Sequence, residues 1–322
     1  MIRRIALAIF LAAAFLAAPP ARARQAQPQI TIHPAEVSPS AKLRMILAVA
    51  HAGPRVVTVG EDGVILLSDD NGKSYRQARS VPIQATLNSV HFVDDKTGWA
   101  AGHWGAILKT TDGGETWQLQ RSDTGQDRPI FSVLFLTPTE GFAVGLWSLV
   151  LSTKDGGASW QETPLPKPPG SPKADLNLTS VFADRKGSLF VTAEGGKLVT
   201  SDDRGATWRY LDTGYRGTFW TGLQLSDGSL LIGGLRGTIY RSLDGGQSWA
   251  AAKTDAQSSV TGLAQLADGK VVGSALDGVL LSSEDNGVTF HSSQRDDREV
   301  LTAVLPLAGA NYLVFTKHGI EN

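Results

Sequence analysis

Hydrophobic and polar residues alternate with a period of two in short segments along most of the chain. The clearest unit, residues 87–120, reads LNSVHFVDD, GWAAGHW, GAILKTTD and TWQLQ, with turn residues between the segments. Alternation of this kind is typical of half-buried β-strands, so the unit predicts four short strands. Residues 24–322 carry no convincing helical periodicity. The pattern therefore predicts an all-β protein.

An eight-residue motif recurs once in each unit, with the pattern Ser/Thr, any, Asp, any, Gly, any, Ser/Thr, aromatic. It occurs as SDDNGKSY (68–75), TTDGGETW (110–117), TKDGGASW (153–160), SDDRGATW (201–208), SLDGGQSW (242–249) and SEDNGVTF (283–290). The shared Asp residues are Asp70, Asp112, Asp155, Asp203, Asp244 and Asp285, in steps of 42, 43, 48, 41 and 41. A Pro-rich stretch, residues 164–173, accounts for the long step and predicts a loop insertion.

A second repeat, a glycine-containing hairpin, precedes each motif and appears a seventh time near the C-terminus as TKHGIEN. Four strands in each unit, repeated at a fixed period, predict a β-propeller of four-stranded antiparallel blades. We expect seven blades in a single domain over residues 24–322. The last unit provides only two strand segments, LTAVLPL and NYLVFTKHG. We expect the strand-like QITIH (29–33) to pair with that unit and close the ring.

The repeated motif is expected to be structural. Its Asp is suited to accept hydrogen bonds from backbone N–H groups two residues on, and its Gly to adopt the positive φ of a tight turn. The Ser/Thr hydroxyls can bond the turn backbone, and the aromatic ring can pack between blades. Six Asp residues spread around a ring cannot converge on one substrate.

The N-terminus predicts export. Arg3 and Arg4 precede fourteen apolar residues, 5–18, and Ala21-Arg22-Ala23 is a small-residue cleavage signature, so residues 1–23 are expected to be a cleaved signal peptide. Removing its three arginines changes the formal net charge from −1 to −4, which disfavours nucleic acid as a partner. The chain has no cysteine, hence no attachment point for a lipid anchor. We expect a periplasmic monomer.

The sequence offers little for catalysis. The Arg-Ile-Pro or Arg-Leu-Pro signature of sialidases is missing, and Tyr215 and Tyr312, the two tyrosines outside motifs and outer strands, lack an evident Glu partner. The six histidines are scattered without metal-ligand spacing. We therefore expect no enzyme activity, no catalytic residues, no metal and no cofactor. A glycan-binding or glycan-cleaving propeller is the alternative.

A binding surface is predicted on the rim opposite the motifs, where the hairpins between second and third strands lie with the loops between blades. Trp104 and Trp147 occupy matching places in consecutive hairpins, and Arg216 and Arg236 lie on the same rim. Tryptophan and arginine are enriched in protein interfaces. These four residues are the candidate partner-binding residues. The alternatives are that the tryptophan rings fill the central channel or cover a neighbouring blade, and that the arginines are solvated surface charges.

The repeats also carry a resemblance. The octapeptide is similar to the Asp-box (BNR) repeat of sialidases and other propellers. The longer unit LNSVHFVDDKTGWAAGHWGAILKTTDGGETW resembles the blade unit of the photosystem II stability/assembly factor family, whose members act in photosynthesis. The resemblance implies a propeller that binds proteins without catalysis and helps to assemble a membrane complex. We therefore expect a scaffold or assembly factor for a membrane or envelope complex.

Overall fold

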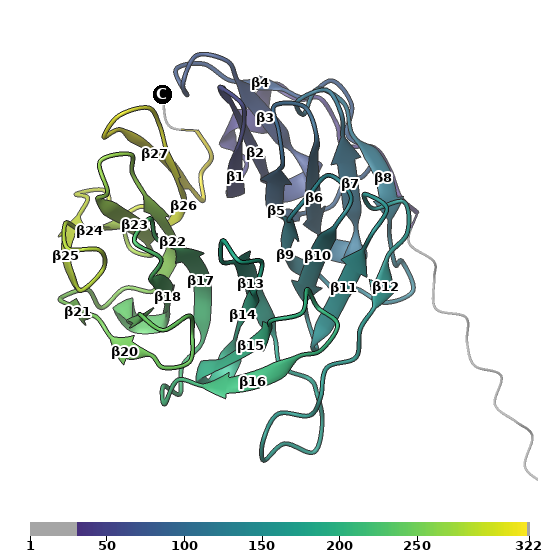
Figure 1. The fold of residues 1–322 in the computed structure, drawn as a ribbon. Coiled ribbons are helices and arrows are strands. Elements are labelled where there is room, and N and C mark those ends of the chain that lie inside the picture. Colours follow the sequence, from purple (N-terminus) through teal and green to yellow (C-terminus); the bar gives the residue numbers. More distant parts are fainter. Residues whose placement is uncertain (1–30, 321–322) are drawn as a thin grey trace, which may run out of the picture.

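The computed structural model describes residues 31–320, and these form a ring of antiparallel β-sheets around a central opening (Figure 1). The predicted signal peptide, residues 1–23, lies outside the described residues. No helix within residues 31–320 has the length and apolar character needed to cross a membrane. The described helical segments are short 3-10 turns, namely η1 (Pro39–Leu43), η2 (Glu61–Gly63), η3 (His103–Gly105), η4 (Glu194–Gly196) and η5 (Leu235–Gly237).

Six sheets contain four antiparallel strands in the predicted order, and one of these six has a fifth strand. Blade 1 contains β1 (Ile46–Ala52), β2 (Arg55–Gly60), β3 (Ile65–Ser68) and β4 (Arg76–Gln77). Blade 2 contains β5 (Leu87–Phe92), β6 (Gly98–Gly102), β7 (Ile107–Thr110) and β8 (Gln118–Arg121). Blade 3 contains β9 (Ile130–Phe135), β10 (Gly141–Gly145), β11 (Leu149–Thr153) and β12 (Gln161–Glu162).

The second half of the ring continues the pattern. Blade 4 contains β13 (Leu178–Ala183), β14 (Leu189–Ala193), β15 (Lys197–Ser201) and β16 (Arg209–Asp212). Blade 5 contains β17 (Phe219–Gln224), β18 (Leu230–Gly234), β19 (Ile239–Ser242) and β20 (Ala250–Ala251). Blade 6 contains β22 (Val260–Gln265), β23 (Val271–Ala275), β24 (Val279–Ser283) and β25 (Thr289–Gln294), with β21 (Lys253–Thr254) added in parallel to β25. The final sheet has two strands, β26 (Leu301–Pro306) and β27 (Tyr312–Thr316).

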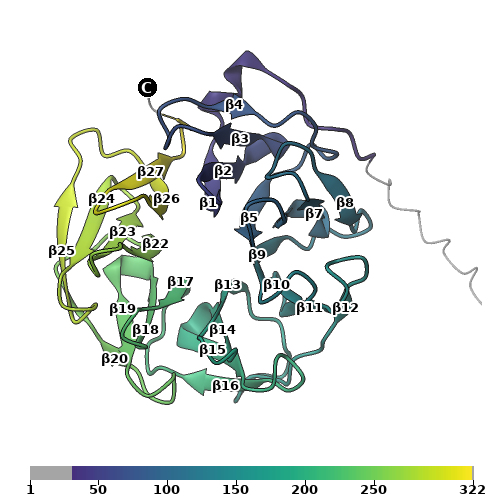
Figure 2. The same cartoon turned by 45° about the horizontal axis from the view of Figure 1, so that its top comes forward.

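The first strand of every sheet lies closest to the axis, so that β1, β5, β9, β13, β17, β22 and β26 surround the central opening (Figure 2). Each of these strands carries a register shift near its start, for example between Leu87 and Ser89 in β5. The repeat therefore includes this register shift as well as the strands themselves. The two-stranded sheet keeps the same shift, between Leu301 and Ala303.

The Asp-box turns join the third and fourth strands, as predicted. In the second box, Thr110 Oγ1 donates to Asp112 Oδ1 at 2.8 Å and accepts from the Gly114 N–H at 3.0 Å. Asp112 also accepts from the Thr116 N–H at 2.9 Å. These three bonds recur in the other five boxes. The Asp carboxylate thus accepts from the N–H four residues later, whereas the sequence analysis predicted a bond to the N–H two residues later. The observed bond spans the whole turn.

The box glycine brings each blade against the sheet before it. All six have φ between 79° and 88°, a conformation that favours glycine. A Cβ added to any of them would approach a side chain of the preceding sheet to 3.2 Å or less. The contacts are Leu67 for Gly114, Gln120 for Gly157, Phe142 for Gly205, Phe190 for Gly246, Leu231 for Gly287 and Leu313 for Gly72. The box is therefore a joint between neighbouring sheets.

The ring is closed by side-chain packing of the last sheet against both neighbours. On one side Phe315 meets Tyr75 of the first box edge-on, with ring centroids 6.5 Å apart, in a core shared with blade 1. On the other side Tyr312 packs with Leu266 of blade 6. His51 Nε2 also lies 2.7 Å from the Pro306 carbonyl oxygen. The two-stranded sheet is thus held from both sides without outer strands.

The expected seven four-stranded blades, closed by an N-terminal strand, are wrong. The structure has six blades, five with four strands and one with five, and the two predicted strands of the last unit form the two-stranded sheet. Residues 29 and 30 of the predicted closing strand lie outside the described range. The following residues lie beside the linker between blades 1 and 2, where the Gln84 N–H donates to the His33 carbonyl at 2.6 Å and the Ala35 N–H to Val81 at 3.0 Å. Because the first box already packs on β27, closure needs no added strand.

Acid should destabilise the fold in two pH ranges with different causes. In the boxes, bonds from the Ser/Thr hydroxyl and backbone N–H four residues on lower the pKa of Asp70, Asp155, Asp203 and Asp244 from 3.8 to about 2. A lowered carboxyl pKa stabilises the fold above pH ~4, and this contribution is lost as the pH falls toward 2. Burial lowers the pKa of His91, on β5, from 6.5 to about 4. The unfolded chain then binds the extra proton, so stability also falls between about pH 6.5 and 4.

Urea unfolding between pH 7 and 2.5 measures both ranges. We expect His91→Gln to flatten the upper range and leave the lower one unchanged. A free energy of unfolding that stays constant below pH 4 would contradict the role given to the boxes.

Candidate protein-binding rim

The rim opposite the boxes is built from the hairpins that join the second and third strands. Each begins with a backbone bond to the residue before the first strand of its own sheet, for example His103 N–H to the Thr86 carbonyl at 2.9 Å. The equivalent donors in the other sheets are Glu61, Leu146, Glu194, Leu235, Leu276 and Lys317. This bond fixes every hairpin to the inner strand, so the residue at its tip has a defined position on the rim.

The tip residue has a left-handed conformation in all six complete blades. Its φ is 55° at Asp62, 56° at Trp104, 54° at Trp147, 66° at Gly195, 57° at Arg236 and 61° at Asp277. Only blade 4 uses glycine, which adopts this conformation without strain. A tryptophan here is uncommon and costs backbone energy, and such strain often marks a functional position. Two consecutive blades carry one.

Trp147 is exposed on this rim. The residue is 47% exposed to solvent, and the adjacent Ser148 also has a positive φ of 55°. Arg128, from the linker between blades 2 and 3, donates from Nη2 to the Trp147 carbonyl at 3.5 Å and pairs with Glu162 at 3.1 Å. The arginine therefore supports the hairpin backbone and leaves the indole ring free. Sequence analysis missed Arg128 because a linker arginine carries no repeat signal.

Trp104 has a different environment. It is partly buried against the core shared by blades 1 and 2, together with Ile32 and Ala35 of the N-terminal segment. Its backbone N–H donates to Asp127 Oδ1 at 2.8 Å, and His103 Nδ1 lies 3.0 Å from Asp127 Oδ2. Trp104 is therefore largely a packing residue, whereas Trp147 is exposed to solvent.

Arg216 and Arg236 lie on neighbouring segments of the rim. The Tyr215 hydroxyl donates to the Leu235 carbonyl at 3.1 Å, and the Leu235 N–H donates to Thr218 at 3.0 Å, so the linker that carries Arg216 packs on the hairpin that carries Arg236. Both arginines are exposed. Neither makes an ion pair with another residue of the described chain, although Arg216 contributes to lowering the pKa of Asp212, after the larger effect of Lys197.

Most other charges on this rim are paired. Arg44 lies 3.4 Å from Asp62, Arg298 2.6 Å from Asp277, and His318 2.9 Å from Glu299. The hydrogen bond and charge of Arg298 hold the pKa of Asp277 below its usual value. Arg216 and Arg236 are therefore exposed positive charges without an ion pair in the described chain, as is Lys317 of the last hairpin. The structure places all four candidate residues on one rim, with the arginines adjacent and the tryptophans in unlike surroundings.

The comparisons with known proteins agree with this fold. Residues 76–230 match the family model PSII_BNR, described as photosynthesis system II assembly factor YCF48. Over this range the repeats are similar to those of the photosystem II assembly factor-like family. The resemblance seen in the sequence is thereby confirmed. No curated protein matches the sequence at a significant level.

Solved structures show the same architecture. That of YCF48 bound to D1 peptide superposes with a TM-score of 0.70 at 19% identity, covering 90% of this chain and 97% of that one. YCF48 from Cyanidioschyzon merolae gives 0.67 at 17% identity, covering 89% and 97%. The extracellular domain of a putative one-component system from B. thetaiotaomicron gives 0.67 at 11% identity, covering 86% of this chain and 38% of that one. At these identities the likenesses establish the fold.

The two tryptophans should respond differently to replacement by glycine. Trp147→Gly relieves the left-handed strain and removes little packing, so its free energy of unfolding should stay within about 1 kcal/mol of the wild type. Trp104→Gly removes a ring packed on the core and should cost about 2 kcal/mol or more. Urea unfolding of both variants measures the difference. Equal losses would show that Trp147 is also a packing residue.

Proposed function

We propose that this protein is an exported, non-enzymatic propeller that binds a protein partner through the hairpin rim. In this proposal it acts as a scaffold or assembly factor for a membrane or envelope complex and works in the periplasm as a monomer. The observation that carries the proposal is Trp147, an exposed indole held at a φ of 54° on a hairpin tip. Exposed aromatic anchors of this kind are typical of interface hot spots.

The contrast between the two rims supports the choice of surface. The box rim repeats nearly the same residues in six blades, so it carries little information that could specify a partner. The hairpin rim presents Asp62, Trp104, Trp147, Gly195, Arg236 and Asp277 at equivalent positions. Functional residues tend to lie on loops held by a rigid scaffold. A surface that changes from blade to blade suits specific recognition of a protein.

The hydrogen bonds and low pKa values of the box carboxylates support a function without catalysis. Each accepts hydrogen bonds inside its own turn, and four of them have a pKa of about 2. A general acid needs a pKa near the working pH, which for a carboxyl group means a raised value. The most repeated acidic groups are therefore suited to structure. The family match and the likeness to YCF48 in its D1 peptide-bound structure support protein binding as the activity.

Charge reversal on the rim tests the proposal. Arg216→Glu with Arg236→Glu should weaken capture of the partner at least tenfold, about 1.4 kcal/mol, with little change in melting temperature. Lys154→Glu with Lys186→Glu makes the same charge change at exposed positions on the box rim and should leave capture unchanged. Crosslinking in the periplasm identifies the partner, and binding of the purified variants to it gives the affinities.

Two results would contradict the proposal. Equal weakening by both pairs would indicate a nonspecific charge effect. Micromolar binding to a glycan array that is lost in the Arg216 and Arg236 variant would instead favour the glycan-binding alternative.

A further inference from the structure

The two-stranded sheet leaves one backbone edge open within the described chain. The Leu307 N–H bonds the Asn311 carbonyl at 2.8 Å, and β26 then pairs with β27 through Leu305 with Leu313 and Val304 with Val314. Because bonded and non-bonded pairs alternate in an antiparallel ladder, Leu313 directs its N–H and C=O toward β26, whereas Tyr312 and Val314 direct theirs outward. In each complete blade the third strand pairs with this edge.

Blade 6 shows a matching gap in its apolar packing. The residue three positions before the first Ser/Thr of the box is 0–1% exposed in five blades, where it packs against the following blade. These residues are Ile65, Ile107, Val150, Leu198 and Ile239. Leu280, the equivalent residue of blade 6, is only partly buried, since the following sheet has no outer strands to cover it. Blade 6 therefore presents an unfilled apolar position toward the open edge.

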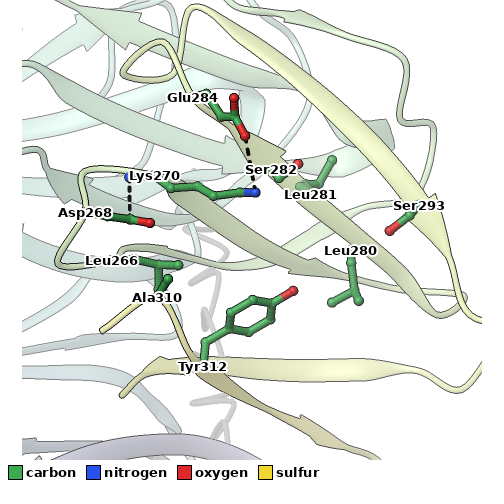
Figure 3. Close-up of a pocket in the computed structure, with 10 residues that line it drawn as sticks. All are labelled: Leu266, Asp268, Lys270, Leu280, Leu281, Ser282, Glu284, Ser293, Ala310 and Tyr312. Atoms are coloured by element: carbon green, nitrogen blue, oxygen red, sulfur yellow. Dashed lines mark hydrogen bonds and ion pairs between the residues drawn. The ribbon is translucent and has the colours of Figure 1, made fainter. Parts of the chain in front are cut away.

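A groove of ≈ 300 Å³ lies between these two surfaces (Figure 3). Tyr312 of β27 points into it toward Leu280, and Leu266 and Leu281 contribute further apolar surface. At one end Lys270 lies 3.5 Å from Glu284, and with Asp268 these side chains leave one net negative charge. An extended backbone, a few apolar side chains and one basic side chain would complement this groove.

We propose that the groove binds an extended segment of a partner polypeptide, which adds to β27 as an antiparallel third strand. Its backbone pairs with Tyr312 and Val314, one apolar side chain covers Leu280, and a basic side chain meets Asp268. Strand addition to an open edge is a common mode of peptide recognition. Blade 6 flanks the edge, so a slender segment fits where a second whole propeller would be excluded. The site lies on a different surface from the hairpin rim, and the inference shares with the proposed function only a polypeptide ligand.

A synthetic peptide of residues 106–121, which contains the third strand, box and fourth strand of blade 2, is a suitable probe. We expect it to bind the full chain and to slow hydrogen exchange of the Val314 amide at least tenfold. Val314→Pro removes the outward N–H and no hydrogen bond to β26, and it should weaken peptide binding at least tenfold. Leu280→Asp places a charge in the apolar lining of the groove and should also weaken peptide binding at least tenfold. This variant tests the groove if Val314→Pro does not fold. A peptide with proline in place of Leu108 and Thr110, the residues whose N–H groups face the second strand in blade 2, is the control ligand.

Three results would overturn the inference. A Val314 amide already protected in the free full chain would mean that residues outside 31–320 fill the edge. Unchanged Val314 exchange in the presence of bound peptide would place the peptide elsewhere. Failure of the peptide to bind at all would show that the edge does not accept a strand. Trp147→Gly should leave peptide binding intact, so failure at the groove and failure at the rim are distinguishable.

Discussion

The hydrogen-bonded turn of the Asp-box is the interaction on which the other contacts of this ring depend. Asp112 spans its turn by bonding Thr110 and Thr116, and the buried Thr110 hydroxyl in turn holds the Gly114 N–H. This network fixes a positive φ at the glycine and lets the turn backbone approach the preceding sheet. With the aromatic residue that follows, the turn packs on its neighbour six times around the ring. The first of these contacts, from blade 1 to β27, closes the circle without a covalent link.

Much of this fold could be predicted from local sequence. Alternation of hydrophobic residues predicted the strands, and the box spacing predicted the blades, because both signals repeat every forty residues or so. Ring closure could not be predicted in the same way. It depends on Gly72 and Tyr75 meeting Leu313 and Phe315, a contact between opposite ends of the chain. The strand-like pattern of residues 29–33 gives no indication of which edge the segment meets.

The candidate site shows the same limit. The hairpin repeat predicted that Trp104 and Trp147 occupy equivalent positions, and both do, at φ values of 56° and 54°. Their exposure differs because the segment around Ile32 and Ala35 packs beside Trp104. That segment lies outside the repeat, so the repeat carries no signal for it. Leu280 is a related case, since it resembles its buried counterparts in sequence and differs only in having no outer strands beside it.

The closing contact allows a direct test of the box as a joint. Gly72 and Gly214 have similar φ values, 84° and 78°, but a Cβ at Gly72 would lie 2.6 Å from Leu313 Cδ1, whereas a Cβ at Gly214 has no atom within 4 Å. Alanine at either site incurs the left-handed penalty of about 1–2 kcal/mol. Only Gly72→Ala should add an overpacking cost of about 1–3 kcal/mol. The free energy of unfolding of both variants, measured in urea, should therefore be lower for Gly72→Ala, and equal values would contradict closure of the ring through the first box.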